Sequence, residues 1–119
     1  MNDKCPVYKA SNILGKRWTI LILLELHKGK DKWKRYTAIK SKLMDITPKI
    51  LSERLKELKE EDLIKKRIDA SMVPVKTEYS LTKSGEDIIQ IITCMKKWAL
   101  KWKVKNSECE KISCEECNL

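Results

Sequence analysis

The sequence lacks a long hydrophobic run. Its longest aliphatic stretch, Ile20–Leu24, ends at Glu25, whereas a helix needs about 20 apolar residues to cross a bilayer. The first eight residues include Asp3 and Lys4 and contain no apolar h-region of a secretory signal. We therefore expect a cytoplasmic protein with no membrane partner. The only histidine is His27, and no His, Ser, Asp and Cys set has the spacing of a catalytic constellation, so an enzyme is not expected.

Internal repeats and low-complexity segments are also absent, and 119 residues suffice for one modest core. The 26 Lys and Arg residues outnumber the 17 Asp and Glu residues, which gives a net charge of +9. Residues 106–119 contain four glutamates and one lysine, a charge of −3, which leaves +12 on residues 1–105. The expected organisation is a basic domain over residues 1–105 and an acidic cysteine-rich tail over residues 106–119. Such a charge favours nucleic acid as a partner, although solubility alone also explains it.

Hydrophobic spacing and helix-ending residues divide the chain into helices and strands. The helix that starts at residue 16 or 17 is apolar on nearly all sides, which predicts a central buried helix, and residues 30–35 form a charged loop. The predicted helices cover residues 6–14, 16–28, 36–43, 47–58 and 82–103, and the predicted strands cover residues 63–69 and 75–81. The fold class is therefore mainly α with a small β-hairpin, in the order α-α-α-α-β-β-α.

Residues 47–58, T-P-K-I-L-S-E-R-L-K-E-L, are the most informative segment. Thr47 can cap a helix and Pro48 suits its first position. Three leucines share one face at helical spacing, so that face should lie against a core. The opposite face carries polar groups that can reach base edges and phosphates. A basic helix followed by a basic hairpin is typical of a winged helix-turn-helix, and predicts binding to double-stranded DNA.

The candidate DNA contacts form two groups. On the recognition helix, Glu53 can accept a hydrogen bond from cytosine and Ser52 suits several bases. The recognition-helix candidates are Thr47, Lys49, Ser52, Glu53, Arg54 and Lys56. The candidates on the wing and the preceding helix, for phosphate or the minor groove, are Thr37, Lys40, Lys65, Arg67 and Lys76. Arg54 lies at the edge of the apolar face, where it either reaches phosphate or braces the fold. For any single lysine, a solvated surface role is the alternative.

Two other binding functions stay open. An RNA-binding module is one, although neither an aromatic-rich sheet nor a G-x-x-G loop is present. A winged helix that contacts only proteins is the other. Gel shift or calorimetry with DNA from upstream of the protein's own gene separates these alternatives from operator binding.

Several linked motifs resemble those of the HxlR-type transcriptional regulators, a winged-helix branch akin to the MarR group. The motifs are C-P-V at 5–7, I-L-G-K-R-W at 13–18, P-K-I-L-S-E-R-L-K-E-L at 48–58 and E-Y-S-L-T-K-S-G at 78–85. The resemblance covers about residues 5–103. It implies homodimers that bind palindromic operators, with the first and last helices forming the dimer contact. This sequence departs from the family in a longer loop at residues 30–34 and in Asp62, where the family has glycine, which predicts a strained turn.

The last predicted helix bears on the oligomeric state. Its two tryptophans and several isoleucines form a stripe broader than one side of a small domain covers, which favours a homodimer. Coverage by the first two helices within a monomer is the alternative. The interface candidates are Ile88, Ile91, Ile92, Met95, Trp98 and Trp102.

Five cysteines are an odd number, and a reducing compartment disfavours a disulfide framework. Cys5 is at a helix N-cap near cationic residues, which favours a nucleophilic thiol, and the resemblance places it where responsive family members carry their sensing thiol. An inert, packed cysteine is the alternative, and the oxidant or small-molecule effector is open. Cys109, Cys114 and Cys117 have spacing that suits zinc or iron but lack a fourth ligand. An unstructured, unligated tail and a local disulfide between Cys114 and Cys117 are the alternatives, and DNA binding itself requires no cofactor.

Overall fold

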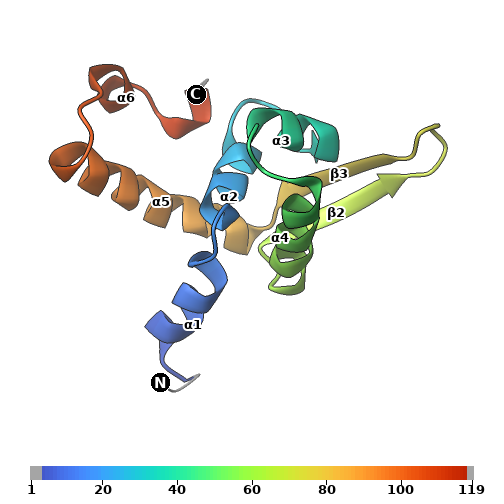
Figure 1. Cartoon of the computed structure of the whole chain (residues 1–119), viewed down its shortest axis with the longest axis horizontal. Coiled ribbons are helices and arrows are strands. Elements are labelled where there is room, and N and C mark those ends of the chain that lie inside the picture. The colour runs from blue at the N-terminus through green and yellow to red at the C-terminus, as the bar shows by residue number, and fades with distance from the viewer. Residues whose placement is uncertain (1–3, 118–119) are drawn as a thin grey trace.

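The computed structural model describes residues 4–117 (Figure 1). It is mostly helical with a small sheet, which confirms the predicted fold class. The elements are α1 (Pro6–Leu14), α2 (Thr19–His27), β1 (Lys34–Arg35), α3 (Tyr36–Lys42), α4 (Pro48–Glu60), β2 (Ile64–Asp69), β3 (Lys76–Leu81), α5 (Lys83–Trp102), α6 (Ser107–Lys111) and the 3-10 helix η1 (Cys114–Glu116). The sequence did not predict β1, α6 or η1.

The core forms around α2. Ile22 and Leu23 are completely buried, and they belong to one cluster with apolar residues from α3, α4, α5 and the sheet. The predicted start of α2 at residue 16 or 17 is wrong, because Trp18 has a φ of 80° and takes the left-handed conformation. An L-residue in that conformation cannot continue a right-handed helix, so α2 begins only at Thr19.

Helix α2 ends where the sequence predicts. Its C-terminal carbonyls are bound by Lys34, a residue that the sequence did not indicate for this role. Lys28 caps the helix and Gly29 follows with a φ of +75°. The ammonium group of Lys34 donates hydrogen bonds to the backbone carbonyls of Glu25 and Lys28, which places a cation at the negative end of the helix dipole. Burial lowers the pKa of Lys34 below its ordinary value, and the Glu25 carboxylate opposes that shift.

The sheet is antiparallel, with strand order β1-β3-β2. In the register of the sheet, Arg35 on β1 and Arg67 on β2 both lie opposite Glu78 on the central strand. Strand β1 has only two residues within a charged segment, so it carries no alternating pattern that predicts a strand. The hairpin of β2 and β3, called the wing from here on, projects from the body of the molecule (Figure 1).

Hydrogen-bonded threonine caps fix the N-terminal ends of α4 and α5. The hydroxyl of Thr47 accepts a hydrogen bond from the Ile50 amide, and that of Thr82 accepts one from the Gly85 amide, as the sequence predicts. Asp62 has a φ of 61°, which confirms the left-handed turn. A Cβ on Gly85 would lie 2.1 Å from the Leu63 carbonyl oxygen, so only glycine allows α5 to start so close to the sheet.

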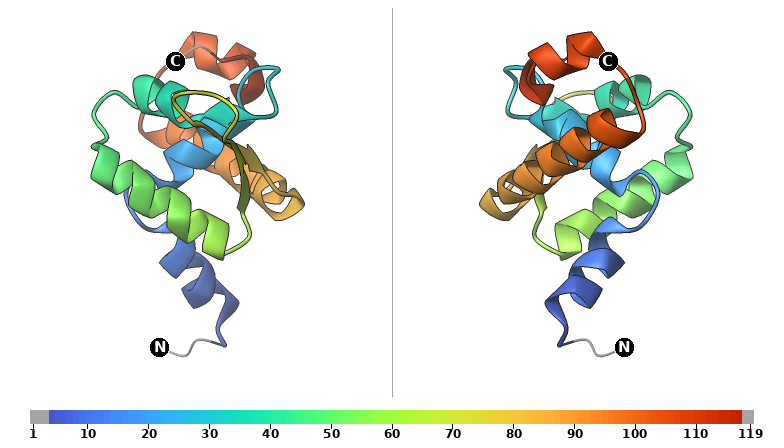
Figure 2. Two further views of the ribbon diagram at one scale, coloured as in Figure 1. Left: turned by 90° about the vertical axis from the view of Figure 1, so that its right-hand side faces the viewer. Right: turned by 90° about the vertical axis from the view of Figure 1, so that its left-hand side faces the viewer.

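The tail folds back over the end of α2 and beside α5, on the side away from α4 (Figures 1 and 2). The Gly29 amide donates a hydrogen bond of 2.8 Å to the Glu115 carbonyl. The Lys96 ammonium donates one of 2.7 Å to the Ile112 carbonyl. None of the helices in the described part of the chain combines the length and apolarity that a membrane span needs.

Candidate nucleic-acid interface

Helix α4 presents two different faces. Leu51, Leu55 and Leu58 are buried on one side, as the spacing of the leucines predicts. Lys49, Ser52, Glu53 and Lys56 are exposed on the other side. Within residues 4–117, the side chains of Lys49, Glu53 and Lys56 have no hydrogen bond or ion pair. Their charged groups are therefore available to a ligand from outside the chain.

Tyr36 ties α3 to the start of α4. Its hydroxyl donates a hydrogen bond of 3.1 Å to the Pro48 carbonyl and lies 3.2 Å from the Ser52 hydroxyl, with which it shares a second hydrogen bond. The Thr47 hydroxyl is engaged in its cap. Thr47 therefore caps α4 and Ser52 ties α4 to α3, and both residues are exposed.

Arg54 does not face outward with the other candidates. Its Nε donates a hydrogen bond of 3.0 Å to the Arg17 carbonyl, and its terminal nitrogen lies 3.3 Å from the Glu57 carboxylate. The side chain is only 16% exposed. Of the two roles predicted for Arg54, the structure supports bracing of the fold, and Arg54 leaves the set of DNA candidates.

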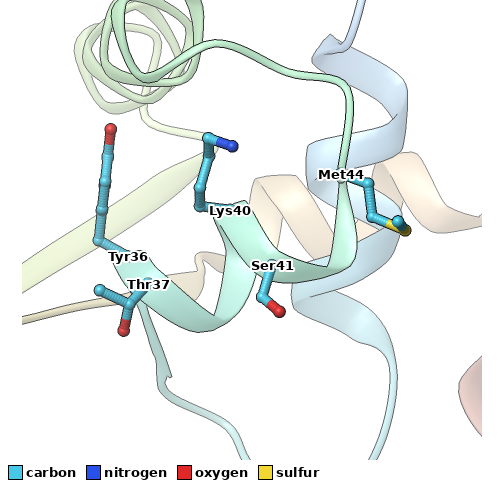
Figure 3. Close-up of a pocket in the computed structure, with 5 residues that line it drawn as sticks. All are labelled: Tyr36, Thr37, Lys40, Ser41 and Met44. Atoms are coloured by element: carbon cyan, nitrogen blue, oxygen red, sulfur yellow. The ribbon is translucent and has the colours of Figure 1, made fainter.

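Helix α3 contributes one side of a shallow pocket (Figure 3). Tyr36 and Lys40 extend from α3 towards the same side, whereas Thr37 and Ser41 point away from it. Met44 completes the lining. Thr37 is exposed and Lys40 half-buried, and these two predicted contacts point in different directions from α3.

The predicted cations of the wing gather around one carboxylate and one indole. The Arg67 Nε lies 2.9 Å from the Glu78 carboxylate, and the Lys76 ammonium lies 3.6 Å from it. Arg67 and Lys65 also stand over the Trp33 ring, at 4.3 and 5.5 Å from its centroid. The hydrogen bond from Arg67 lowers the pKa of Glu78 below its ordinary value, while desolvation opposes this shift.

Sequence reasoning missed two members of this region. Lys66 is exposed and stands 5.9 Å from the Tyr79 ring centroid, and its place in a run of three cations was a signal for it. For Trp33, the sequence predicts only a place in the charged loop of residues 30–35. Nothing local to its segment indicates that its ring meets β2, because that contact depends on the pairing of β1 with β3.

The apolar stripe on α5 is exposed along most of its length. Ile91, Met95, Trp98 and Trp102 are 46–64% exposed. Ile88 is half-buried. Ile92, in contrast, is buried in the core of the protomer, so the prediction that it lies in a dimer interface is wrong. The geometry of a helix explains this, because Ile92 is turned about 100° from Ile91.

Helix α1 projects from the body and has no buried residue (Figure 1). Two ion pairs connect α1 and the segment after it to α4. Lys9 lies 3.7 Å from Glu61, and Lys16 lies 3.2 Å from Glu57. A pocket between these pairs is also lined by Thr19, whose buried hydroxyl has no hydrogen-bond partner in the described structure. Movement of α1 would therefore act on the C-terminal half of the recognition helix.

None of the five cysteines, all within the described range, is in a disulfide. Cys5 is the half-buried N-cap of α1. Among residues 4–117, no three His, Cys, Asp or Glu side chains lie close enough to hold a metal ion. The structure therefore does not gather the predicted ligands Cys109, Cys114 and Cys117 into one site.

Helices α3 and α4, followed by the wing, define the winged helix-turn-helix class of DNA-binding proteins. The chain belongs to the HxlR-like helix-turn-helix family, whose model matches residues 13–107. It is similar to the uncharacterised HTH-type transcriptional regulator YvaP of Bacillus subtilis (strain 168), with 38% identity over 102 residues, which cover 85% of this chain and 91% of YvaP.

Two solved structures support the same assignment. A MarR-family transcriptional regulator from Porphyromonas gingivalis W83 superposes with a TM-score of 0.76 and 33% identity, over 86% of this chain and 96% of that one. The reduced form of the transcriptional regulator YodB from B. subtilis superposes with a TM-score of 0.71 and 33% identity, over 87% and 98% of the two chains. YodB has also been solved after diamide treatment and with a bound quinone. The protein is a DNA-binding transcriptional regulator of this family.

Proposed function

We propose that the protein acts as a homodimer that binds an inverted-repeat operator and releases it when Cys5 is modified. The observation that carries the proposal is that the polar face of the recognition helix α4 and an apolar stripe on α5 are both exposed on the same molecule. The stripe consists of Ile91, Met95, Trp98 and Trp102. A second copy of the chain is the occupant that fits both features, because two-fold pairing covers both stripes and presents two α4 helices.

Helix α1 supports the same arrangement. With no residue buried and Val7 76% exposed, a nine-residue helix gains little from its own protomer, and isolated helices of this length are marginal in water. Contact with the partner subunit supplies the missing burial. A dimer of this kind prefers half-sites whose centres are about one helical turn, roughly 10 bp, apart or a multiple of it.

Sedimentation tests the dimer. Replacing Met95 and Trp98 together by glutamate should yield monomer, because the charges would be desolvated in the interface. Gln90→Glu with Lys97→Glu is the matched control, since both residues are exposed on the polar side of α5. We expect the control to stay dimeric. A dimeric Met95→Glu/Trp98→Glu variant would place the interface elsewhere.

Operator binding is tested with DNA from upstream of the protein's own gene. We expect tighter binding to this DNA than to a scrambled duplex at the same salt concentration, and loss of preference when one half-site is inverted. Equal affinity for all duplexes contradicts an operator. Binding to RNA alone, or to neither nucleic acid, would favour one of the two alternative modules.

The proposed response begins at Cys5. The Cys5 thiolate can add to a ring carbon of a quinone, so that the sulfur electron pair forms the sulfur–carbon bond and reduces the ring to a hydroquinone. One hydroquinone oxygen takes a proton from solvent, and the other takes the hydrogen displaced from the attacked carbon. Cys5 starts α1, and the ion pairs Lys9–Glu61 and Lys16–Glu57 continue to α4, so an adduct that moves α1 would reach the reading helix. Treatment with a quinone should abolish operator binding of the wild type and of Cys94→Ser but not of Cys5→Ser. Loss of binding by treated Cys5→Ser rules out this sensor.

We propose no cofactor for this function. The tail cysteines remain testable by elemental analysis of protein purified with and without air. One zinc or iron per chain in the anaerobic preparation would restore the metal hypothesis for Cys109, Cys114 and Cys117.

A further inference from the structure

Trp33 lies at the point where the loop after α2 meets the wing. It directly precedes β1, which pairs with one edge of β3, while β2 pairs with the other edge. Lys65 and Arg67 are two residues apart on β2, so their side chains leave the same face of the sheet. The Trp33 ring reaches this face, 4.3 Å from the guanidinium carbon of Arg67 and 5.5 Å from the ammonium of Lys65.

Glu78 holds Arg67 from a second direction. The Arg67 Nε donates a hydrogen bond of 2.9 Å to the Glu78 carboxylate. A guanidinium has five N–H donors, so this bond leaves the terminal amino groups unused by Glu78. The Arg67 side chain is 52% exposed although it is held by both a ring and a carboxylate. The contacts thus fix the guanidinium without hiding it.

The cluster also stays basic. It contains three cations, Lys65, Arg67 and Lys76, against two carboxylates, that of Glu78 and that of Asp69 on β2, which lies opposite Lys76. An ion pair that served only the fold would need one cation. Stacking uses the face of the guanidinium and leaves its edge for hydrogen bonds to phosphate.

We propose that Trp33 is a positioning residue for DNA binding, which holds Arg67 and Lys65 in the orientation that meets the DNA backbone beside the wing. This inference rests on the proposed operator binding. Its physical basis is that long cationic side chains lose rotamer freedom when they bind, and side chains ordered beforehand lose less. Trp33 itself need not touch the DNA.

The first test uses the free protein. ¹⁵N relaxation should report a rigid Arg67 Nε–H in the wild type and in Trp33→Phe, which keeps a ring face, and a mobile one in Trp33→Leu. Arg35 is exposed and, within residues 4–117, has no side-chain hydrogen bond or ion pair, so its Nε–H serves as a mobile internal control. An equally rigid Arg67 in Trp33→Leu overturns the inference.

The second test is a double-mutant cycle on operator affinity. Trp33→Leu should weaken binding about 3- to 10-fold, in the range of one or two cation–π contacts, and Trp33→Phe should restore most of the loss. In a Lys65→Ala/Arg67→Ala background, Trp33→Leu should change nothing further. The same loss in that background, or no loss in the wild type, contradicts the proposal. Trp33→Met, which keeps apolar volume without a ring face, replaces Trp33→Leu if urea unfolding shows that the leucine variant is unstable.

Lys49→Ala separates this inference from the proposed function. If Lys49→Ala weakens operator binding but Lys65→Ala/Arg67→Ala does not, the inference about Trp33 fails and operator reading by α4 stands. If none of these variants changes binding, the proposed reading of DNA fails as well.

Discussion

The outward face of α4 and the wing both carry cations, but in different states. Within the described chain, Lys49 and Lys56 have no hydrogen bond or ion pair. Arg67 and Lys76, in contrast, share the Glu78 carboxylate, and Arg67 stacks on Trp33. Side chains without an intramolecular partner can adapt to base edges, which differ from site to site. Side chains that are held in place by a partner are better matched to the DNA backbone, which is the same at every site.

The glutamates of the two regions differ in the same way. Glu53 is exposed on α4 and, among residues 4–117, pairs with no cation, so it can accept a hydrogen bond from a cytosine amino group. Glu78 is buried on the central strand between two cations. We therefore expect the Glu53 carboxylate to read a base, whereas the Glu78 carboxylate is a structural partner of Arg67 and Lys76.

The largest effect on operator affinity is expected from the free cations of α4. Lys49→Ala and Lys56→Ala should each cost about 1–3 kcal/mol and relax the preference at a particular operator position. Folding should be intact, because both residues are exposed. Lys97→Ala, on an exposed position of α5, is the control and should bind as the wild type. Wild-type affinity and unchanged preference in both α4 variants would show that α4 is not the reading helix.

The wing should respond differently. Arg67→Ala should weaken all sequences alike and reduce the salt dependence by roughly one charge. Lys76→Ala should have a smaller effect, because its side chain is 25% exposed compared with 52% for Arg67. Binding titrations at several salt concentrations, with operator and scrambled DNA, measure both. A change confined to the operator would remove the distinction between helix and wing.

Acid should release the held cations of the wing. The pKa of Glu78 is lowered from an ordinary value of 4.5, chiefly by the hydrogen bond from Arg67. A carboxyl group whose pKa is lower in the folded state contributes stability above its unfolded pKa, and this contribution disappears as the pH falls through the folded value. Glu78→Gln should therefore be less stable than the wild type at pH 7, and the difference should shrink below about pH 4.5. Urea unfolding at several pH values measures it, and a constant difference contradicts the assignment.

The sequence predicts elements whose signals are local. Proline at the start of α1 and the threonine caps of α4 and α5 lie within a few residues of the backbone groups that they affect. The outward face of α4 likewise follows from helical spacing alone. For these features, the residues that determine the structure are neighbours in the chain.

The remaining features depend on contacts between distant residues. Arg54 meets the Arg17 carbonyl, Ser52 meets Tyr36, and Trp33 meets Arg67 only after the chain has folded. The left-handed φ of Trp18 likewise has no local signal in the sequence, because tryptophan does not favour that conformation. Composition and spacing therefore indicate which residues are cationic and outward-facing, but not which of them are held by a partner.

The smallest effect concerns Asp62, in the turn that joins α4 to the wing. Its φ of 61° is unfavourable for a residue with a Cβ. Its carbonyl accepts the hydrogen bond from the Thr82 hydroxyl through the backbone, so a change of side chain leaves that bond in place. Asp62→Gly should stabilise the fold by about 0.5 kcal/mol, because relief of the strain slightly exceeds the added entropy of the unfolded chain. Glu60→Gly, at the last position of α4, is the control and should destabilise by about 0.5–1 kcal/mol. Urea unfolding compares the two, and destabilisation of both would show that the turn holds no strain.

DNA binding by Asp62→Gly should be unchanged if the turn only connects α4 to the wing. Weaker binding would mean that the rigidity of the turn keeps the free cations of α4 and the held cations of the wing in register.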